Sequence, residues 1–186
     1  MDIKCIALDL DRTTLNEHAR LSDGNREALE YAISKGVHIV IASGRGFDSL
    51  PEDVLSIPGI EYAITSNGAS VYHIPSGKRL MSYTLTPRSV QEILALTAGH
   101  HVAYEAFIDG IAYAQEDYVE HPDLYGAANA AQYIRSTRRP VPAFQNFLLE
   151  HRHELESIDL VVSNEAQKME LWDLLQRNVA DIYITS

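Results

Sequence analysis

The stretch Ile6-Ala7-Leu8-Asp9-Leu10-Asp11-Arg12-Thr13-Thr14-Leu15 decides the fold, because it joins an apolar strand to two carboxylates. Residues 3–8 form an almost continuous apolar run, which is typical of a parallel strand covered on both faces. The two-residue period of a strand sends Asp9 and Asp11 to the same side. Two acids in one small space are costly alone, so the pattern indicates a divalent metal or protonation of one acid. The alternative is an acidic turn in which Asp serves local hydrogen bonds.

Two more strands are predicted, and each ends in small polar residues. Residues 37–42 are apolar apart from His38 and lead into Ser43-Gly44-Arg45, and residues 61–65 lead into Ser66-Asn67-Gly68. Helices are predicted between the strands, over residues 23–35 and, interrupted by Pro51, 47–55. Strands that alternate with helices favour a parallel sheet, which binds ligands at the carboxyl ends of its strands. We therefore expect the three polar tips to converge.

The pattern changes after this α/β region. A hairpin over residues 69–85 is followed by a helix over 86–98, and Asp109-Gly110 predicts a second hairpin within residues 102–114. Further helices are predicted over 143–155 and 165–177, with strands over 158–162 and 182–185. The sequence thus predicts two modules, an α/β domain over residues 1–85 and an α+β domain over 86–186.

The composition narrows the functional class. The formal net charge of −11 over 186 residues argues against nucleic acid as a partner, and Arg138-Arg139-Pro140 is interpreted as a solvated loop rather than a basic patch. The only cysteine, Cys5, is expected to be a small buried hydrophobe, and no internal disulfide can form. With no apolar run long enough to cross a bilayer and no signal-peptide pattern, we expect a cytoplasmic protein without a membrane partner.

In order and spacing, Asp9-Leu10-Asp11-Arg12-Thr13, Ala42-Ser43-Gly44-Arg45 and Ser66-Asn67-Gly68-Ala69 resemble the motifs of the haloacid dehalogenase superfamily. The chain is most similar to its Cof-like sugar-phosphate phosphatases. The resemblance implies a three-layer Rossmannoid core in the first module and an inserted α+β cap in the second. It also implies a Mg²⁺-dependent phosphoric monoester hydrolase that acts on small phosphorylated metabolites through an aspartyl-phosphate intermediate.

The resemblance assigns roles to particular residues. Asp9 would be the nucleophile, and Asp11 the general acid and base. Both would contribute to the Mg²⁺ site, Asp11 through its backbone carbonyl. Ser43 would hydrogen-bond a phosphoryl oxygen. Four further residues lie where the family approaches its substrate: Gly44, Arg45, Asn67 and Gly68.

The sequence departs from the family pattern in two respects. Arg12 stands where the family usually has Gly, and Thr14 where it has an apolar residue, so the loop beside the phosphate is expected to be reshaped. The family also needs a lysine beyond the cap and a later acidic pair, and neither is present by residue 186. We therefore expect a fragment with little or no activity, which self-associates through an incomplete core.

Two other functions fit the same residues. One is a non-catalytic protein that binds a phosphorylated ligand or has a regulatory role, and the other is a phosphomutase of similar architecture. The histidines at 100, 101, 151 and 153 have no acidic or thiol partner at a known spacing, so they are interpreted as surface residues rather than a transition-metal site.

Overall fold

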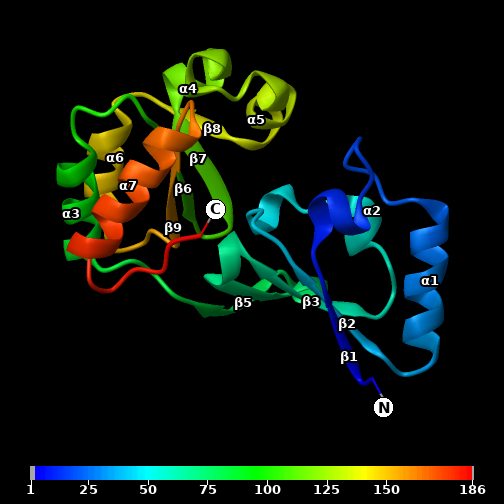
Figure 1. Ribbon diagram of the computed structural model, residues 1–186. Helices are drawn as coiled ribbons and strands as arrows, with labels where there is room; N and C mark the ends of the chain where they lie inside the picture. Colours follow the sequence, from blue (N-terminus) through cyan, green and yellow to red (C-terminus); the bar gives the residue numbers. More distant parts are fainter. Residues whose placement is uncertain (1–2, 186) are drawn as a thin grey trace. The chain divides into compact units, whose positions relative to one another are not determined.

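The computed structural model describes residues 3–185, which divide into two compact units at Tyr83 and Thr84. The first unit contains a five-stranded sheet in the order β1-β2-β3-β4-β5 (Figure 1). Its strands and helices are β1 (Cys5–Leu8), α1 (Asp23–Ser34), β2 (His38–Ala42), α2 (Glu52–Leu55), β3 (Ile60–Thr65), β4 (Ser70–His73) and β5 (Lys78–Ser82). Short 3₁₀ turns occur at Phe47–Ser49, Ser66–Gly68 and Ile74–Ser76.

Both the parallel strands and the hairpin that the sequence predicted belong to this sheet. β1, β2 and β3 are parallel neighbours, and β4 and β5 extend the sheet as an antiparallel hairpin. The Ser22 side chain caps α1 by accepting a hydrogen bond from the Asn25 N–H, and Gly36 follows the helix end at φ +77°. The expected mixed α/β fold with a parallel sheet is confirmed.

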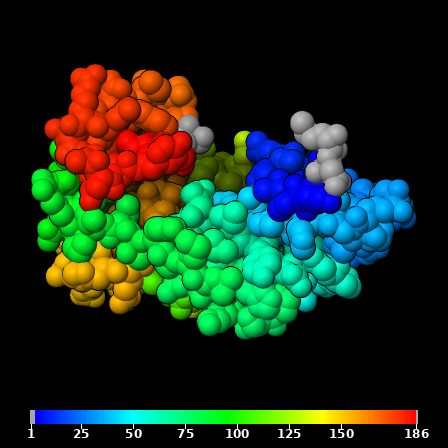
Figure 2. Space-filling view, turned by 90° about the horizontal axis from the view of Figure 1, so that it is seen from below, coloured from blue at the N-terminus to red at the C-terminus, as the bar shows by residue number. Residues whose placement is uncertain are grey.

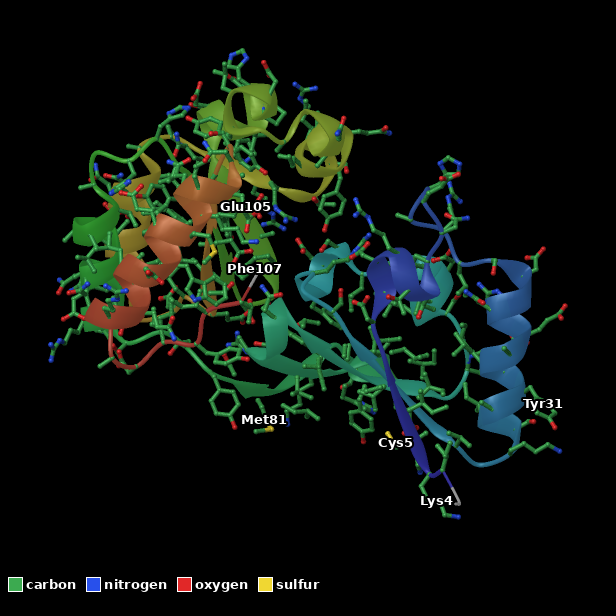
Figure 3. The ribbon with its side chains drawn as sticks, in the orientation of Figure 1. Lys4, Cys5, Tyr31, Met81, Glu105 and Phe107 are labelled. Atoms are coloured by element: carbon green, nitrogen blue, oxygen red, sulfur yellow. The ribbon has the colours of Figure 1, made fainter. Side chains whose placement is uncertain are left out.

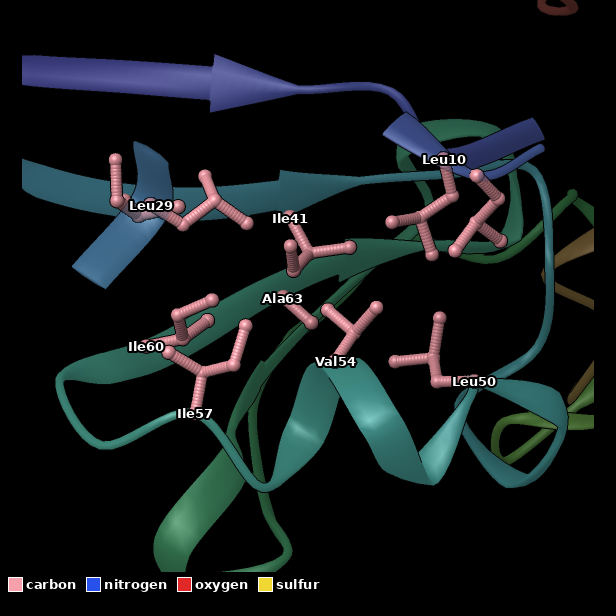
Figure 4. Packing of buried hydrophobic residues seen from close by; sticks show 10 residues of the cluster. Leu10, Leu29, Ile41, Leu50, Val54, Ile57, Ile60 and Ala63 are labelled. Atoms are coloured by element: carbon pink, nitrogen blue, oxygen red, sulfur yellow. The ribbon is translucent and has the colours of Figure 1, made fainter. Parts of the chain in front are cut away.

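One face of the first sheet carries the core. Leu29 of α1 and Val54 of α2 pack against Ile39, Ile41 and Ala63 of the sheet (Figure 4). These side chains are at most 8% exposed. Because α1 and α2 contact the same cluster, both helices cover this one face.

The opposite face of the first sheet contradicts the expectation for Cys5. Ile6 and Leu8 turn toward the core, so the alternation of the strand turns Cys5 and Ala7 outward, and both are exposed. Figure 2 shows the dark blue atoms of this end of the chain at the surface, beside the lighter blue of α1. The prediction that β1 is buried on both faces, with Cys5 in the core, was wrong.

The second unit is built on a four-stranded sheet in the order β8-β7-β6-β9. Its elements are α3 (Pro87–Thr97), β6 (Ala103–Ile108), β7 (Ile111–Gln115), α4 (Glu116–Glu120), α5 (Ala131–Thr137), β8 (Arg139–Val141), α6 (Phe144–Glu150), β9 (Ser157–Val161) and α7 (Glu165–Asn178). Short 3₁₀ turns occur at Pro122–Tyr125 and Ala128–Ala130. The hairpin predicted at Asp109-Gly110 is confirmed, since β6 and β7 are antiparallel around it.

Two expectations for this unit were wrong. Residues 182–185 form no strand: Ile182 and Ile184 pack beside α3 and α7 as an extended segment. Arg138 is not in a solvated loop, because its side chain is 10% exposed and forms an ion pair with Glu105 of β6 at 2.8 Å. Arg139 and Pro140 lie in β8, an edge strand, where proline is tolerated.

Helix length bears on membrane crossing. Among the residues that the structure describes, no helix combines the length and apolar character needed to cross a bilayer.

Candidate active site

The carboxyl ends of β1, β2 and β3 lie side by side, because the three strands are parallel and aligned. Leu8 pairs with Ile41, and Ala42 pairs with Ile64. Beyond the strands, the Ser43 N–H donates to the Ile64 carbonyl at 2.9 Å, and the Ser66 N–H donates to the Arg45 carbonyl at 2.9 Å. These two bonds join the segments that follow β2 and β3.

Asp9 is held by the turn that follows β1. The Thr13 hydroxyl donates to Asp9 Oδ2 at 2.7 Å, and the Thr14 hydroxyl donates to the Asp9 carbonyl at 2.6 Å. The turn closes through a 2.8 Å bond from the Leu15 N–H to the Leu10 carbonyl. Leu10 is fully buried, whereas Asp9 is exposed. The Thr13 hydroxyl thus fixes one oxygen of an exposed carboxylate.

Arg12 adopts a backbone conformation that is typical of glycine. Its φ is +59°, in the left-handed region that glycine adopts without strain, and its side chain is exposed. The chain therefore keeps the backbone conformation that suits glycine while it carries a cation at that point.

Asp11 forms a bidentate ion pair with Arg45. Arg45 Nε donates to Asp11 Oδ2 at 3.0 Å, and Arg45 Nη2 donates to Asp11 Oδ1 at 2.6 Å. Arg45 Nη1 donates to the Ser49 carbonyl at 3.0 Å, which fixes the guanidinium. The Arg45 side chain is 7% exposed, whereas that of Asp11 is 50% exposed. A buried, planar guanidinium thus holds both oxygens of the second carboxylate.

Ser43, Gly44 and Asn67 form the other side of the site. The Ser43 hydroxyl is largely buried and accepts from the Arg45 N–H at 3.2 Å. A Cβ at Gly44 would lie 2.6 Å from Asn67 Oδ1, so the amide fits only because residue 44 has no side chain. Asn67 itself has φ +54°. Gly68 borders open space.

The contacts connect some of the predicted site residues and leave others apart. Asp11, Arg45 and Ser43 form one bonded group, and Gly44 contacts Asn67. Asp9 is held instead by Thr13 and Thr14, which were not predicted as site residues. The Thr13 side chain follows Asp9 by four residues, a spacing at which a short hydroxyl side chain can reach back in a turn, so the signal was present in the sequence.

The donor set only partly fits Mg²⁺. Asp9 offers a free carboxylate oxygen, but both side-chain oxygens of Asp11 accept from Arg45. Within residues 3–185 no group of three or more His, Cys, Asp or Glu side chains could hold a metal. Mg²⁺ prefers six oxygen ligands, so these residues do not complete a site by themselves.

Comparison with known proteins identifies the family. The model of the haloacid dehalogenase-like hydrolases matches residues 6–186. The chain belongs to this family. It is 40% identical over 72 residues to 5-amino-6-(5-phospho-D-ribitylamino)uracil phosphatase YcsE of Bacillus subtilis, a match that covers 39% of the chain and 29% of the relative.

Solved structures of haloacid dehalogenase-like hydrolases have the same fold. One from B. subtilis, 25% identical, has a TM-score of 0.71, and the match covers 99% of the chain and 70% of that structure. The subclass IIB sugar phosphatase BT4131 has a TM-score of 0.74 at 17% identity, with 92% and 63% covered. The fold predicted from the motifs that follow the three parallel strands is therefore confirmed as that of haloacid dehalogenase-like phosphatases.

Proposed function

We propose that the chain acts in a phosphoric monoester hydrolase, with Asp9 as the nucleophile. The observation that carries the proposal is the exposed Asp9 carboxylate, fixed by Thr13 at the carboxyl end of β1. Family membership and the phosphatase names of the relatives support it.

The chemistry needs two carboxylates in different roles. One Asp9 oxygen forms a bond to phosphorus while the bond to the leaving oxygen breaks, and that oxygen takes a proton from Asp11. Water then attacks the phosphorus of the aspartyl phosphate and gives a proton to Asp11. Inorganic phosphate leaves and Asp9 is regenerated.

Arg45 determines when Asp11 can act as the general acid. Both Asp11 oxygens accept guanidinium hydrogen bonds, so one of these bonds must open before an oxygen carries a proton to the leaving group. The freed N–H would then be available for the charge on the phosphoryl group. The ion pair is thus the resting arrangement in this proposal.

The substrate proposed is a small phosphorylated metabolite of the sugar-phosphate type. Support comes from two similar proteins, one a phosphatase of a phosphorylated ribityl compound and one a sugar phosphatase. The matched segments span only part of both proteins.

The test is turnover of p-nitrophenyl phosphate by the chain and by Asp9→Asn. We expect Asp9→Asn to abolish any turnover while inorganic phosphate still binds, because the amide keeps the shape but is a poor nucleophile. Asp23→Asn, an exposed position at the start of α1, is the matched control and should leave the rate unchanged. Turnover that survives Asp9→Asn would disprove the role of Asp9. Release of an isomeric phosphate ester in place of inorganic phosphate would indicate a phosphomutase.

A non-catalytic function is favoured by one observation, the occupation of both Asp11 oxygens by Arg45. A chain that only binds phosphorylated ligands would show no turnover, and Asp9→Asn would leave its affinity for inorganic phosphate intact. Turnover that depends on Asp9 therefore indicates hydrolysis, whereas phosphate binding without turnover indicates the binding function.

Weak Mg²⁺ binding is the third part of the proposal. With two nearby carboxylates, one of them engaged by Arg45, we expect dissociation constants in the millimolar range by calorimetry. Arg45→Met should tighten binding because it frees the Asp11 carboxylate. Micromolar affinity in the unmodified chain would contradict this expectation.

A further inference from the structure

An open surface cavity of about 490 Å³ is lined only by residues of the second unit. It is bordered by the ends of β7 and β8 and by the segments that lead into α4 and α6 (Figure 1). Its volume lies within the range of about 300–1,000 Å³ that is common for small-molecule sites.

The topology explains why a crevice forms at this place. β7 and β8 are parallel neighbours, so their carboxyl ends are adjacent. The chain then continues in opposite directions: Tyr118 of α4 packs in the cluster with Ala103 and Ala114, whereas Phe144 of α6 packs with Tyr104 and Ala106. Because Ala103 and Tyr104 are consecutive residues of β6, these clusters lie on opposite faces of the sheet. A point where two such connections diverge is where parallel sheets bind ligands.

The walls of the cavity define the chemistry of a ligand. One side is apolar and consists of Val141, Pro142 and Phe144. The polar side includes the amides of Gln145 and Asn146, which can both donate and accept, and the Glu116 carboxylate, which accepts. These three side chains form no hydrogen bond with other side chains in the described part of the chain, so they are available to a ligand.

A second carboxylate is already fixed in place. Asp117 accepts from the Tyr125 hydroxyl at 2.7 Å, and Tyr125 in turn accepts from Gln115 at 3.2 Å. Burial, followed by the bond to Asp117, raises the pKa of Tyr125 to about 12, so its hydroxyl remains a donor. Gln115 and Asp117 also border the cavity, so part of its polar wall is rigid.

The charge of the lining excludes phosphate. No Lys, Arg or His is among the residues that border the cavity in the described chain, and two carboxylates are. An ammonium ion could only donate, which would leave the two amide N–H₂ groups without acceptors. A ligand with several hydroxyl groups can donate hydrogen bonds to the carboxylates and can accept them from the amides. Its C–H groups can contact the apolar wall.

We propose that this cavity, whose lining includes none of the residues of the Asp9 site, binds an uncharged polyhydroxylated compound, such as a free sugar or sugar alcohol. The site takes the unphosphorylated compound because its wall repels anions. Its existence does not depend on the hydrolase function proposed above.

The test is a titration followed residue by residue in ¹H–¹⁵N correlation spectra, with D-glucose, D-glucose 6-phosphate and D-glucosamine as probes. Glucose should shift the signals of residues 115–117, 141 and 143–146 and saturate in the millimolar range, and glucose 6-phosphate should shift them less at equal concentration. No saturable shift with glucose, or stronger shifts with either charged probe, would overturn the proposal.

A matched pair of variants tests the polar wall. Gln145→Leu should weaken glucose binding about tenfold, because one amide partner is lost. Gln132→Leu makes the same change at an exposed position of α5 outside the cavity and should leave the affinity unchanged. Equal affinities in the two variants would show that the amide of residue 145 plays no part, and would refute the assigned site.

Discussion

Single residues control the backbone of the loop beside Asp9. Arg12 at φ +59° holds a conformation that an L-residue adopts at a cost, and the surrounding bonds from Thr13 and Thr14 keep it there. The sequence alone could identify Arg12 as unusual, but it could not show whether the turn would change shape or accept the strain. The structure shows that the turn accepts it.

Replacement of Arg12 by Gly should raise the free energy of unfolding by about 0.5–1 kcal/mol, because glycine relieves the left-handed strain. The measurement is urea denaturation of both proteins. Arg20→Gly is the control: Arg20 is exposed with no positive φ, so the added glycine should destabilise by a similar amount. A loss of stability in Arg12→Gly as large as in the control would show that residue 12 is not strained.

Inorganic phosphate should bind Arg12→Gly more weakly, because an exposed cation is lost.

Two residues were predicted wrongly for a shared reason. Cys5 is apolar in character and Arg138 is charged, so a reading of residue type placed the first in the core and the second in solvent. Their environments depend on contacts far along the chain: Arg138 meets Glu105 across the second sheet, and the rings of Phe107 and Tyr133 lie 5.6 Å and 5.1 Å from its guanidinium carbon. Such partners cannot be found from local pattern. Figure 3 shows Glu105 and Phe107 on the same strand.

At the level of elements, β6 and β9 bring two acids together. Glu105 and Asp159 are direct partners across the antiparallel pair, and Arg138 forms its ion pair with Glu105. Burial, with the nearby Glu105 carboxylate as the second cause, raises the pKa of Asp159 to about 6, whereas Arg138 and Ser157 act in the opposite direction. Tyr118 faces the same pair from α4, and burial and Glu105 raise its pKa. Asp159 is the group that can change charge near neutral pH.

Asp159 should make the second unit less stable as pH rises. The folded state holds its proton more tightly than the unfolded state, so the stabilising contribution is complete below about pH 4 and is lost as pH rises through about 6. The total corresponds to at most about 3 kcal/mol. Urea denaturation of the chain and of Asp159→Asn across this range measures it. The difference between the two proteins, which cancels the titration of other carboxylates, should change with pH in this direction, and a constant difference would contradict the assignment.

Elements were predictable where their signals were local. The side chains of the helix caps Ser22, Thr86 and Asn164 each accept a hydrogen bond from the backbone N–H three residues later in the chain. The Asp109-Gly110 turn fixes the β6–β7 hairpin in the same local way. β8 and α5 escaped prediction, because each is short and β8 is an edge strand that contains Pro140. The segment 182–185 has the apolar alternation of a strand but pairs with no strand in the described chain. Its apolar residues pack against the second unit without forming a strand.

The candidate site was predictable to a similar extent. Its place at three strand tips followed from the order of motifs along parallel strands. The bidentate contact between Asp11 and Arg45 did not, because it depends on the guanidinium being turned toward β1 by the Ser49 carbonyl. The order of the motifs predicts which segments lie at the same edge of the sheet, whereas the contacts between their side chains require the fold.

At the scale of the whole molecule, the open face of the first sheet is the main surface feature. Register places Ile64, Val71 and Met81 on the face that also carries Cys5, opposite the helices (Figure 3). Tyr62 is 39% exposed and Met81 49% exposed on this face. Contiguous apolar surface of this kind favours association.

We therefore predict self-association through this face at high protein concentration, measured as a rise in mass by light scattering. Met81→Lys should lower the mass, because a charge in an apolar contact is costly. Met169→Lys, at a residue 53% exposed on α7, is the matched control and should have no effect. A monomeric mass at every concentration, or an equal response of the two variants, would refute the prediction.

The pairing of β1 also affects the order in which the two units can fold during synthesis. In the described sheet β1 pairs only with β2, and Cys5 pairs with His38. This strand pairing can form only after residue 38 has been synthesised. On the ribosome, β1 therefore emerges before β2 and stays unpaired until α1 and β2 have been synthesised. The β6–β7 hairpin, by contrast, can close as soon as its two turn residues have been added. We expect such non-local strand pairing to limit the folding rate of the first unit, and local pairing to start that of the second.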